Sequence, residues 1–240
     1  MAVKIGTAGW SIPRQNADQF PADGTSLNRY AARFNVVEIN SSFHRPHRQS
    51  TWQSWHDSVP NDFRFSVKLP KLITHQRRLV DCGDVLEDFL AQAGGLGDKL
   101  AVLLVQLPPK LAFEEPIAAS FFAALVERTA AQIACEPRHL SWFAPKAGAL
   151  LEQLEVARVA ADPAICEPAA CPGGWTGLRY WRLHGSPIIY RSSYQDRIED
   201  YASKLRGGDA NKDVWCIFDN TASSAGAGDA LALMQSSLRE

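Results

Sequence analysis

The sequence lacks the features that mark membrane-spanning and disulfide-stapled proteins. No apolar run approaches the roughly 18 residues that a spanning helix needs, so we expect no membrane partner. Residues 1–6 already read as the start of a strand, so we expect no signal peptide. The five cysteines are odd in number and irregular in spacing, which argues against a disulfide framework and favours a reducing cytoplasm.

Several catalytic and cofactor motifs are also absent. No Gly-x-Gly-x-x-Gly follows the first apolar run, which removes the main argument for a dinucleotide-binding fold. No Gly-x-Ser-x-Gly is present, so a serine hydrolase is not expected. No His-Glu-x-x-His or paired Cys-x-x-Cys marks a metal site, and Cys166 and Cys171, close together in one segment, make only a weak metal pair.

The 240 residues are 46% apolar and 21% charged, which is ordinary for one globular domain spanning residues 1–240. The net charge of -1 conceals an asymmetry, because residues 1–80 hold 11 Lys and Arg against 5 Asp and Glu. A basic first third favours an anionic partner on that side of the molecule. Ordinary solvated surface charge explains the same count.

Eight short apolar runs recur along the chain, and each ends in a polar residue or a turn signal. Such runs are typical of strands buried on both faces. They cover residues 3–9, 36–40, 64–68, 100–107, 132–136, 157–162, 178–184 and 214–220. Because helical patterns separate them, the strands should pair in parallel, and eight in one domain favour a closed TIM-type (β/α)8 barrel over an open sheet.

The helical patterns cover residues 27–34, 85–94, 118–129, 144–154, 194–205 and 228–238, with a weaker candidate at 50–58. Pro116 is a suitable start signal and Gly94 a suitable stop signal. Residues 163–177 hold three prolines and three glycines, so we expect an irregular connection between strands six and seven in place of a full helix.

Polar residues gather where the predicted strands end, which in a barrel is the mouth that carries the active site. We predict catalytic roles for four of them: Glu38, Glu136, Asp162 and His184. We predict that the others, together with two residues of adjoining loops, bind substrate: Trp10, Asn40, Arg45, Lys68, His75, Gln106, Arg138, Arg182 and Asn220.

Alternation along a strand places Arg182 and His184 on one face, as it does Glu136 and Arg138. Arg182 lies one layer below His184, so a buried ion pair with Glu38 or Glu136 is an alternative to substrate binding. Each residue taken singly could also be a cap or a core hydrogen-bond partner.

Two basic loops follow strands two and three, at residues 44–48 and 68–78. Arg and Lys at these positions suit phosphate or carboxylate groups, and solvated loops are the plain alternative. Carboxylates and an imidazole at neighbouring strand ends also admit a divalent metal, with Glu136, Asp162, His184 and Asp219 as ligands, although no tight ligand spacing supports it and no metal-binding residue is assigned.

At these residues the chain resembles the YecE-like family, domain of unknown function 72. The similar blocks follow one another through nearly the whole chain: Gly6-Thr7-Ala8-Gly9-Trp10-Ser11, Val37-Glu38-Ile39-Asn40-Ser41-Ser42-Phe43, Phe63-Arg64-Phe65-Ser66-Val67-Lys68 with Thr74-His75, Gln106-Leu107-Pro108-Pro109, Arg182-Leu183-His184-Gly185 and Phe218-Asp219-Asn220-Thr221. The resemblance implies a TIM-type barrel and no particular reaction. The family pattern has an aromatic residue where Ile12 and His44 stand, so a stacking wall near the first two strands is altered here.

Two functions fit these residues. The first is an enzyme acting on an anionic small molecule or a nucleic-acid fragment, with Lys68, His75, Arg45 and Arg182 holding the anion, Glu136 or Glu38 as general base and His184 as general acid or metal ligand. Phosphoester hydrolysis and sugar-phosphate isomerisation are both compatible with it. The second is a nucleic-acid-binding protein without chemistry that uses the basic loops, against which the pI near 6.6 counts.

Overall fold

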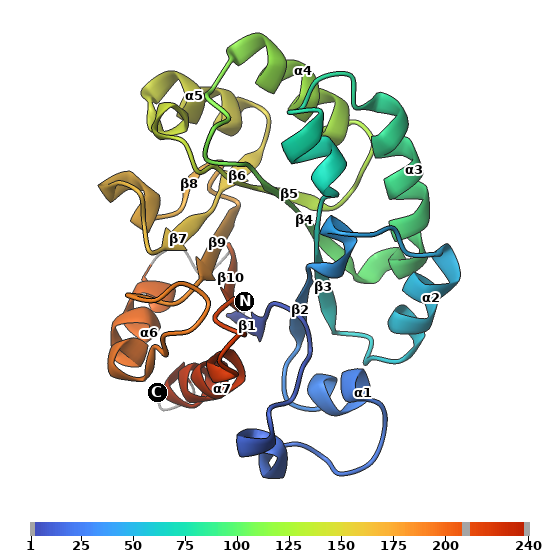
Figure 1. The fold of residues 1–240 in the computed structure, drawn as a ribbon, viewed down its shortest axis with the longest axis vertical. Helices are drawn as coiled ribbons and strands as arrows, with labels where there is room; N and C mark the ends of the chain where they lie inside the picture. Colours follow the sequence, from blue (N-terminus) through green and yellow to red (C-terminus); the bar gives the residue numbers. More distant parts are fainter. Residues whose placement is uncertain (1–2, 208–211, 238–240) are drawn as a thin grey trace.

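The computed structural model describes residues 3–207 and 212–237, and in them strands alternate with helices (Figure 1). The strands are β1 Lys4–Thr7, β2 Val36–Ile39, β3 Arg64–Lys68, β4 Leu100–Gln106, β5 Gln132–Glu136, β6 Val156–Arg158, β7 Ala160–Asp162, β8 Gly173–Gly174, β9 Leu178–Leu183 and β10 Asp213–Phe218. The helices are α1 Ser26–Ala31, α2 Gln49–Asp57, α3 Gly83–Ala93, α4 Glu115–Val126, α5 Pro145–Gln153, α6 Ile198–Arg206 and α7 Ala225–Ser237. All eight predicted strands are therefore confirmed.

The strands form two sheets, in the orders β1-β10-β9-β7 and β2-β3-β4-β5-β6-β8. Pairing within the described residues is parallel except between β6 and the two-residue strand β8. The strands surround the centre of the molecule and the helices lie outside them (Figure 1). The mixed α/β class with parallel sheets is confirmed, but the predicted ring of eight strands is correct only in part, because the ladder is divided between two sheets.

The sixth predicted strand is where one division falls. Its residues make two short strands on either side of Val159, with β6 paired to β5 and β7 paired to β9. The other division lies between β1 and β2, which are joined by one parallel bridge between Ala8 and Glu38. There the Gly9 amide donates to the Glu38 carbonyl oxygen at 2.8 Å.

The helix signals read from the sequence act as expected. Pro116 lies in the first turn of α4, where its missing amide proton is not needed, and α3 ends at the residue before Gly94. The weaker candidate at 50–58 is helix α2. Residues 163–177 hold only a 3₁₀ turn at Glu167–Ala170 and strand β8, so the irregular connection is confirmed, whereas the predicted end of the last helix, Leu238, lies outside the described residues.

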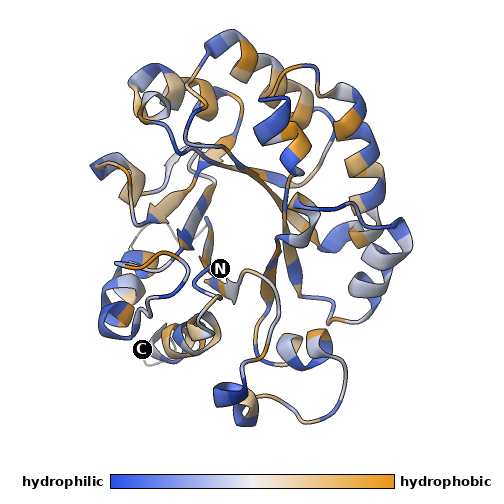
Figure 2. Cartoon of the chain, in the orientation of Figure 1, coloured by the Kyte–Doolittle hydropathy of each residue, from blue (hydrophilic) through white to orange (hydrophobic). Residues whose placement is uncertain are grey.

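Two apolar clusters follow from the alternation of side chains along the strands. One lies between the strands and the helices, with Val37 of β2 and Cys135 of β5 among its members. The other collects the opposite faces, with Val36, Leu104, Ala134, Tyr180 and Trp215 packed together at the centre. Figure 2 shows apolar residues along the strands and many hydrophilic ones on the outer sides of the helices. Residues of the same parity as the central cluster therefore point inward, and at the ends of the strands these positions are polar.

None of the helices in the described part of the chain is both long and apolar enough to span a bilayer.

Candidate functional site

A buried group of charged side chains lies at the carboxyl ends of the inward-facing positions, and we call it the ion cluster. Its members are Glu38, Glu136, Arg182, His184 and Asp219. The first three lie in β2, β5 and β9, and the last two directly follow β9 and β10. Arg138, two residues beyond the end of β5, contacts Glu136 of the cluster. Residues as far apart in sequence as Glu38 and Asp219 meet there, as the predicted arrangement of strand ends requires.

Arg182 is the centre of the ion cluster and is fully buried. Its Nε and Nη2 donate to the two carboxylate oxygens of Glu38 at 3.0 and 2.7 Å. Its Nη1 donates to Glu136 Oε2 at 2.5 Å, and Nη2 also reaches Asp219 Oδ2 at 3.0 Å. The predicted ion pairs of Arg182 with Glu38 and Glu136 are thus both present. Because Nε, Nη1 and Nη2 each donate to a carboxylate, in four hydrogen bonds altogether, the geometry favours a positioning role for Arg182 over the predicted contact with substrate.

Glu38 lies beneath Arg182 and is also fully buried. Its Oε2 accepts a hydrogen bond of 2.9 Å from the Tyr180 hydroxyl, which lies 2.9 Å from Ser66 Oγ as well. Both carboxylate oxygens of Glu38 are thus occupied by Arg182 and Tyr180 inside the protein, and the catalytic role predicted for Glu38 stays a prediction. Tyr180 and Ser66 were not predicted. The signal for them is in the sequence, because each stands two positions before a predicted site residue, Arg182 and Lys68, on the same face of its strand.

His184 lies between two carboxylates. Its Nδ1 is 3.0 Å from Asp219 Oδ2 and its Nε2 is 2.8 Å from Glu136 Oε1. Arg138 Nη2 lies 2.7 Å from the same Nε2 and 2.5 Å from Glu136 Oε1. Since Arg138 can only donate, Nε2 either accepts from Arg138 as a neutral imidazole or donates to Glu136. The neutral imidazole therefore has two alternative tautomers, with its proton on Nδ1 facing Asp219 or on Nε2 facing Glu136, and a ring with both options is suited to acid–base chemistry.

The charges of the ion cluster hold it ionised. Burial would raise the pKa of Glu136, but Arg182, Arg138 and His184 outweigh burial and lower that pKa well below its usual range. Burial and the same arginine act on Asp219, whose pKa is also lowered. Burial would lower the pKa of Arg182, yet Glu38, Glu136 and Asp219 raise it well above its usual value. Glu136 and Asp219 thus remain anionic at neutral pH, and Arg182 compensates them.

Lys68, at the end of β3, differs from the other cations of the site. Within the described residues its Nζ has no hydrogen-bond acceptor and no ion-pair partner, and it lies 4.2 Å from the ring centroid of Phe43. Burial, and then repulsion by Arg182, lower the pKa of Lys68 to about 8. The carboxylates Glu38, Glu136 and Asp219 act in the opposite direction and raise this pKa, but they do not outweigh burial. Lys68 is therefore a half-buried amine whose hydrogen-bond capacity is unused.

Asp162 is not brought into the ion cluster. In the pairing of β7 with β9 it is Ala161 that stands opposite Arg182, so Asp162 faces the other side of the sheet. Its carboxylate accepts hydrogen bonds from Arg197 and from the Tyr201 hydroxyl. The grouping of Asp162 with Glu136 and His184, predicted from its place at a strand end, is corrected by this parity.

Asn220 also has a different setting from the one predicted. It is fully buried, and its side-chain amide donates to Asp229 Oδ2 at 2.7 Å and to the Ser192 carbonyl at 2.9 Å. Asp229, which was not predicted, further accepts from the Tyr194 amide and the Ser193 hydroxyl. These bonds tie the loop after β9 to helix α7, so Asn220 supports the site and does not line it.

The remaining predicted residues are on β4, just after β1 and β2, and on the two basic loops. Gln106 stands beside Glu136 in the β4–β5 register. The Trp10 ring packs edge-on against Trp55 at 5.1 Å, and Trp10 and Asn40 line a common pocket of about 380 Å³. The remaining two are basic residues of the loops, where the His75 ring contacts Phe43 at 5.0 Å and Arg45 is exposed.

The predicted metal ligands are not arranged around a common point. Among residues 3–207 and 212–237 no group of three or more His, Cys, Asp or Glu side chains has the geometry of a metal site. The lone pairs of Glu136 and Asp219 that face the cluster are directed at Arg182 and His184. Cys166 and Cys171 are both free thiols.

Comparison with protein families fits this site and fold. The family model described as "Protein of unknown function DUF72" matches residues 4–240. The chain belongs to the DUF72 family. This confirms the resemblance read from the strand-end motifs, which include four members of the ion cluster.

Curated relatives of this DUF72 protein carry family-level names only. UPF0759 protein YecE of Escherichia coli is 32% identical over 106 residues, which cover 44% of this chain and 38% of that protein. UPF0759 protein YunF of Bacillus subtilis is 28% identical over 149 residues, or 60% of this chain and 53% of that protein. The matched regions thus span less than two thirds of the length of either relative.

Solved structures show the same fold. A DUF72 family protein from Enterococcus faecalis superposes with a TM-score of 0.83 at 18% identity, covering 98% of this chain and 95% of that one. Another from Thermotoga maritima gives a TM-score of 0.79 at 21% identity and covers 98% of both chains. At these identities the likeness concerns the fold alone.

Proposed function

We propose that this DUF72 protein is an enzyme acting on a phosphate- or carboxylate-bearing substrate at the carboxyl ends of its strands. The observation that carries the proposal is Lys68, a half-buried amine without a partner in the described residues, beside a cluster whose other charges are paired. An anionic group of a substrate would compensate the charge of this unpaired amine and accept its unused hydrogen bonds.

The proposal includes closure of the two sheets into one TIM-type barrel. The Ala8–Glu38 bridge connects β1 to β2, and β6 and β7 together pass from β5 to β9. The central apolar cluster, drawn from both sheets, is what the interior of such a barrel contains. In a barrel the strand ends that bear the ion cluster form the mouth.

Each residue has a defined task in this proposal. Lys68 binds the anionic group, and Arg138, at the outer edge of the cluster, assists it. Asp219 orients His184 through Nδ1, and His184 Nε2 and Glu136 Oε1, 2.8 Å apart, form the pair that accepts and returns the substrate proton. A proton-transfer group next to an anion-binding amine fits hydrolysis of a phosphoester or isomerisation of a sugar phosphate.

The test is a panel of small phosphomonoesters and sugar phosphates, assayed for phosphate release and for isomer exchange. We expect Lys68→Met to raise KM at least tenfold and His184→Asn to lower kcat about a hundredfold, the usual contribution of a proton-transfer group. Lys146→Met, which removes an exposed lysine of α5, is the matched control and should behave as wild type. Equal turnover by all three variants would refute the proposal.

A nucleic-acid fragment is a second source of the anionic group, because Arg45 and Lys71 on the two basic loops are exposed. Binding of a short oligonucleotide should then weaken steeply as salt rises from 50 to 200 mM, as counterion release requires. A salt-independent affinity, or none at low salt, would leave only the small molecule. All five cysteines are free, so we keep a reducing, cytoplasmic setting in the proposal.

A further inference from the structure

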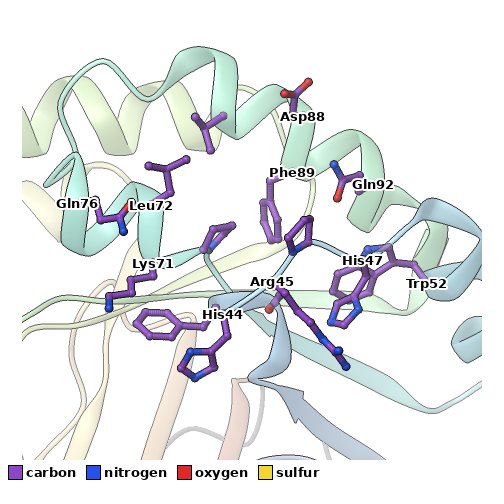
Figure 3. A pocket seen from close by; sticks show the side chains of 15 residues that line it. His44, Arg45, His47, Trp52, Lys71, Leu72, Gln76, Asp88, Phe89 and Gln92 are labelled. Carbon is purple, nitrogen blue, oxygen red and sulfur yellow. The ribbon is translucent and has the colours of Figure 1, made fainter.

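A pocket of about 390 Å³ lies between the loop after β2, the π-helical turn Leu72–Gln76 after β3, and helix α3 (Figure 3). This volume is in the range of pockets that bind small organic ligands. Neither the ion cluster nor the proposed chemistry uses it.

The walls of the pocket are mainly flat and apolar. Phe43 and Pro46 come from the first loop, Pro70 precedes the turn, and Val85 and Phe89 project from α3. Figure 3 shows Phe89 pointing from α3 toward the loop that carries His44 and Arg45. Rings and prolines of this kind suit a planar apolar group, which they contact on its faces.

The polar groups of the pocket are predominantly basic. Arg45, Lys71, His44 and His47 line it, against a single acid, Asp88, which points away from the loop in Figure 3. His44 and Arg45 extend on the side of the loop opposite Phe89. The cationic side of the pocket is thus its rim, across the loop from the apolar wall on α3.

The cationic side is not neutralised within the described chain. Burial lowers the pKa of His75, and Lys68 and Lys71 lower it further. Burial and Arg45 act in the same direction on the pKa of His47. Both shifts leave these imidazoles uncharged at neutral pH, so the positive charge at the pocket is that of Arg45 and Lys71, with Lys68 beyond Phe43, and a bound anion would compensate it.

Phe43 connects the pocket to the proposed reaction site. Its ring lines the pocket, while Lys68 Nζ lies 4.2 Å from the ring centroid and the His75 ring packs edge-on at 5.0 Å. A ligand whose apolar body fills the pocket would carry its charged end past Phe43 toward Lys68.

We propose that this pocket binds the body of the substrate, and that the substrate is an aromatic anion: a planar apolar group carrying the charged group that Lys68 receives. The inference rests on the proposed function for the role of Lys68 and adds the class of molecule to it.

The experiment measures binding of three probes to the full chain by calorimetry: phenyl phosphate, phenol and inorganic phosphate. Phenyl phosphate should bind at least tenfold more tightly than either of the others, because only it has both the ring and the charge. Equal affinity for phenyl phosphate and inorganic phosphate would overturn the inference, since the pocket would then contribute nothing.

Variants locate the binding. Leu72→Trp, at an exposed lining residue, fills part of the pocket and should weaken phenyl phosphate at least tenfold while inorganic phosphate is unchanged. Val85→Trp on α3 tests the same point from the opposite wall. Lys71→Met should weaken phenyl phosphate about threefold or more and leave phenol unaffected, with Lys146→Met as the control. Unchanged phenyl phosphate affinity in both tryptophan variants would overturn the inference.

Failure of the inference and failure of the proposed function give different results. If phenyl phosphate binds as expected but no substrate of the panel is turned over, the pocket is correct and the enzymatic proposal fails. If phenyl phosphate is turned over with the same KM in wild type and Leu72→Trp, the enzymatic proposal stands and the pocket is not its binding site.

Discussion

Replacement of Arg182 by methionine tests the electrostatic account of the ion cluster most directly. The side chain is fully buried and donates to Glu38, Glu136 and Asp219. Methionine fills much of the same volume but leaves three carboxylates without their common cation. Removing one partner from a buried ion pair costs about 3–5 kcal/mol, and we expect Arg182→Met to lower the free energy of unfolding by at least that amount at pH 7.5.

The dependence on pH separates this cause from simple loss of packing. In the wild type the pKa values of Glu136 and Asp219 are lowered, so their contribution to stability is present above the unfolded pKa, near 4, and is lost only at more acid pH. Wild-type stability should therefore change little through these groups between pH 7.5 and 5.5. Arg182 is the largest charge that opposes burial at Glu136 and Asp219, so without it both pKa values should move upward, against the remaining effect of Arg138, His184 and Lys68, and the variant should regain part of its lost stability over the same interval.

Urea denaturation of both proteins at pH 7.5, 6.5 and 5.5 measures these differences. Arg179→Met is the matched control, because Arg179 lies on the same strand, is partly exposed, stacks on the Trp181 ring and, among the described residues, donates to the Lys204 carbonyl alone. The control should lose about 1 kcal/mol or less at every pH. A loss below 1 kcal/mol for Arg182→Met, or a loss that is the same at all three pH values, would refute the reasoning.

Three further predictions concern single side chains. Because burial lowers the pKa of Lys68 to about 8, the free energy of unfolding of the wild type should rise as pH increases from about 8 toward 10.5. Lys68→Met should lack this rise and be more stable than the wild type at pH 7 by on the order of 1–3 kcal/mol. An equal or lower stability of the variant in urea would show that the amine is not desolvated. Asp229→Ala should lower thermal stability by about 1–3 kcal/mol, since the buried Tyr194 amide and Asn220 side chain lose their acceptor; a change of Tm within error would contradict this. Asp162→Asn should retain wild-type turnover in the substrate panel, because Asp162 accepts hydrogen bonds from Arg197 and Tyr201 outside the ion cluster. A hundredfold loss of kcat would show that Asp162 has a catalytic role.

The sequence alone determined where the strands lie and which of their ends carry polarity. Apolar runs of four to eight residues bounded by turn signals are typical of strands buried on both faces of a sheet, and this pattern is visible within each run by itself. Period-two spacing also placed Glu136 with Arg138, and Arg182 with His184, and each pair shares contacts in the structure. Pro116 and the irregular segment at 163–177 were equally readable, because backbone chemistry acts locally.

Only the tertiary structure decided which face of each strand points to the centre and which partners meet there. Asp162 and His184 both stand at strand ends, but the break in the sixth strand and its register with β9 turn Ala161 inward in place of Asp162. Arg182 binds three carboxylates at once only because strands that are distant in sequence pack together; Glu38 and Arg182, for example, are 144 residues apart. Packing between distant segments sets the strand register and decides which side chains meet, so a local sequence pattern does not predict either.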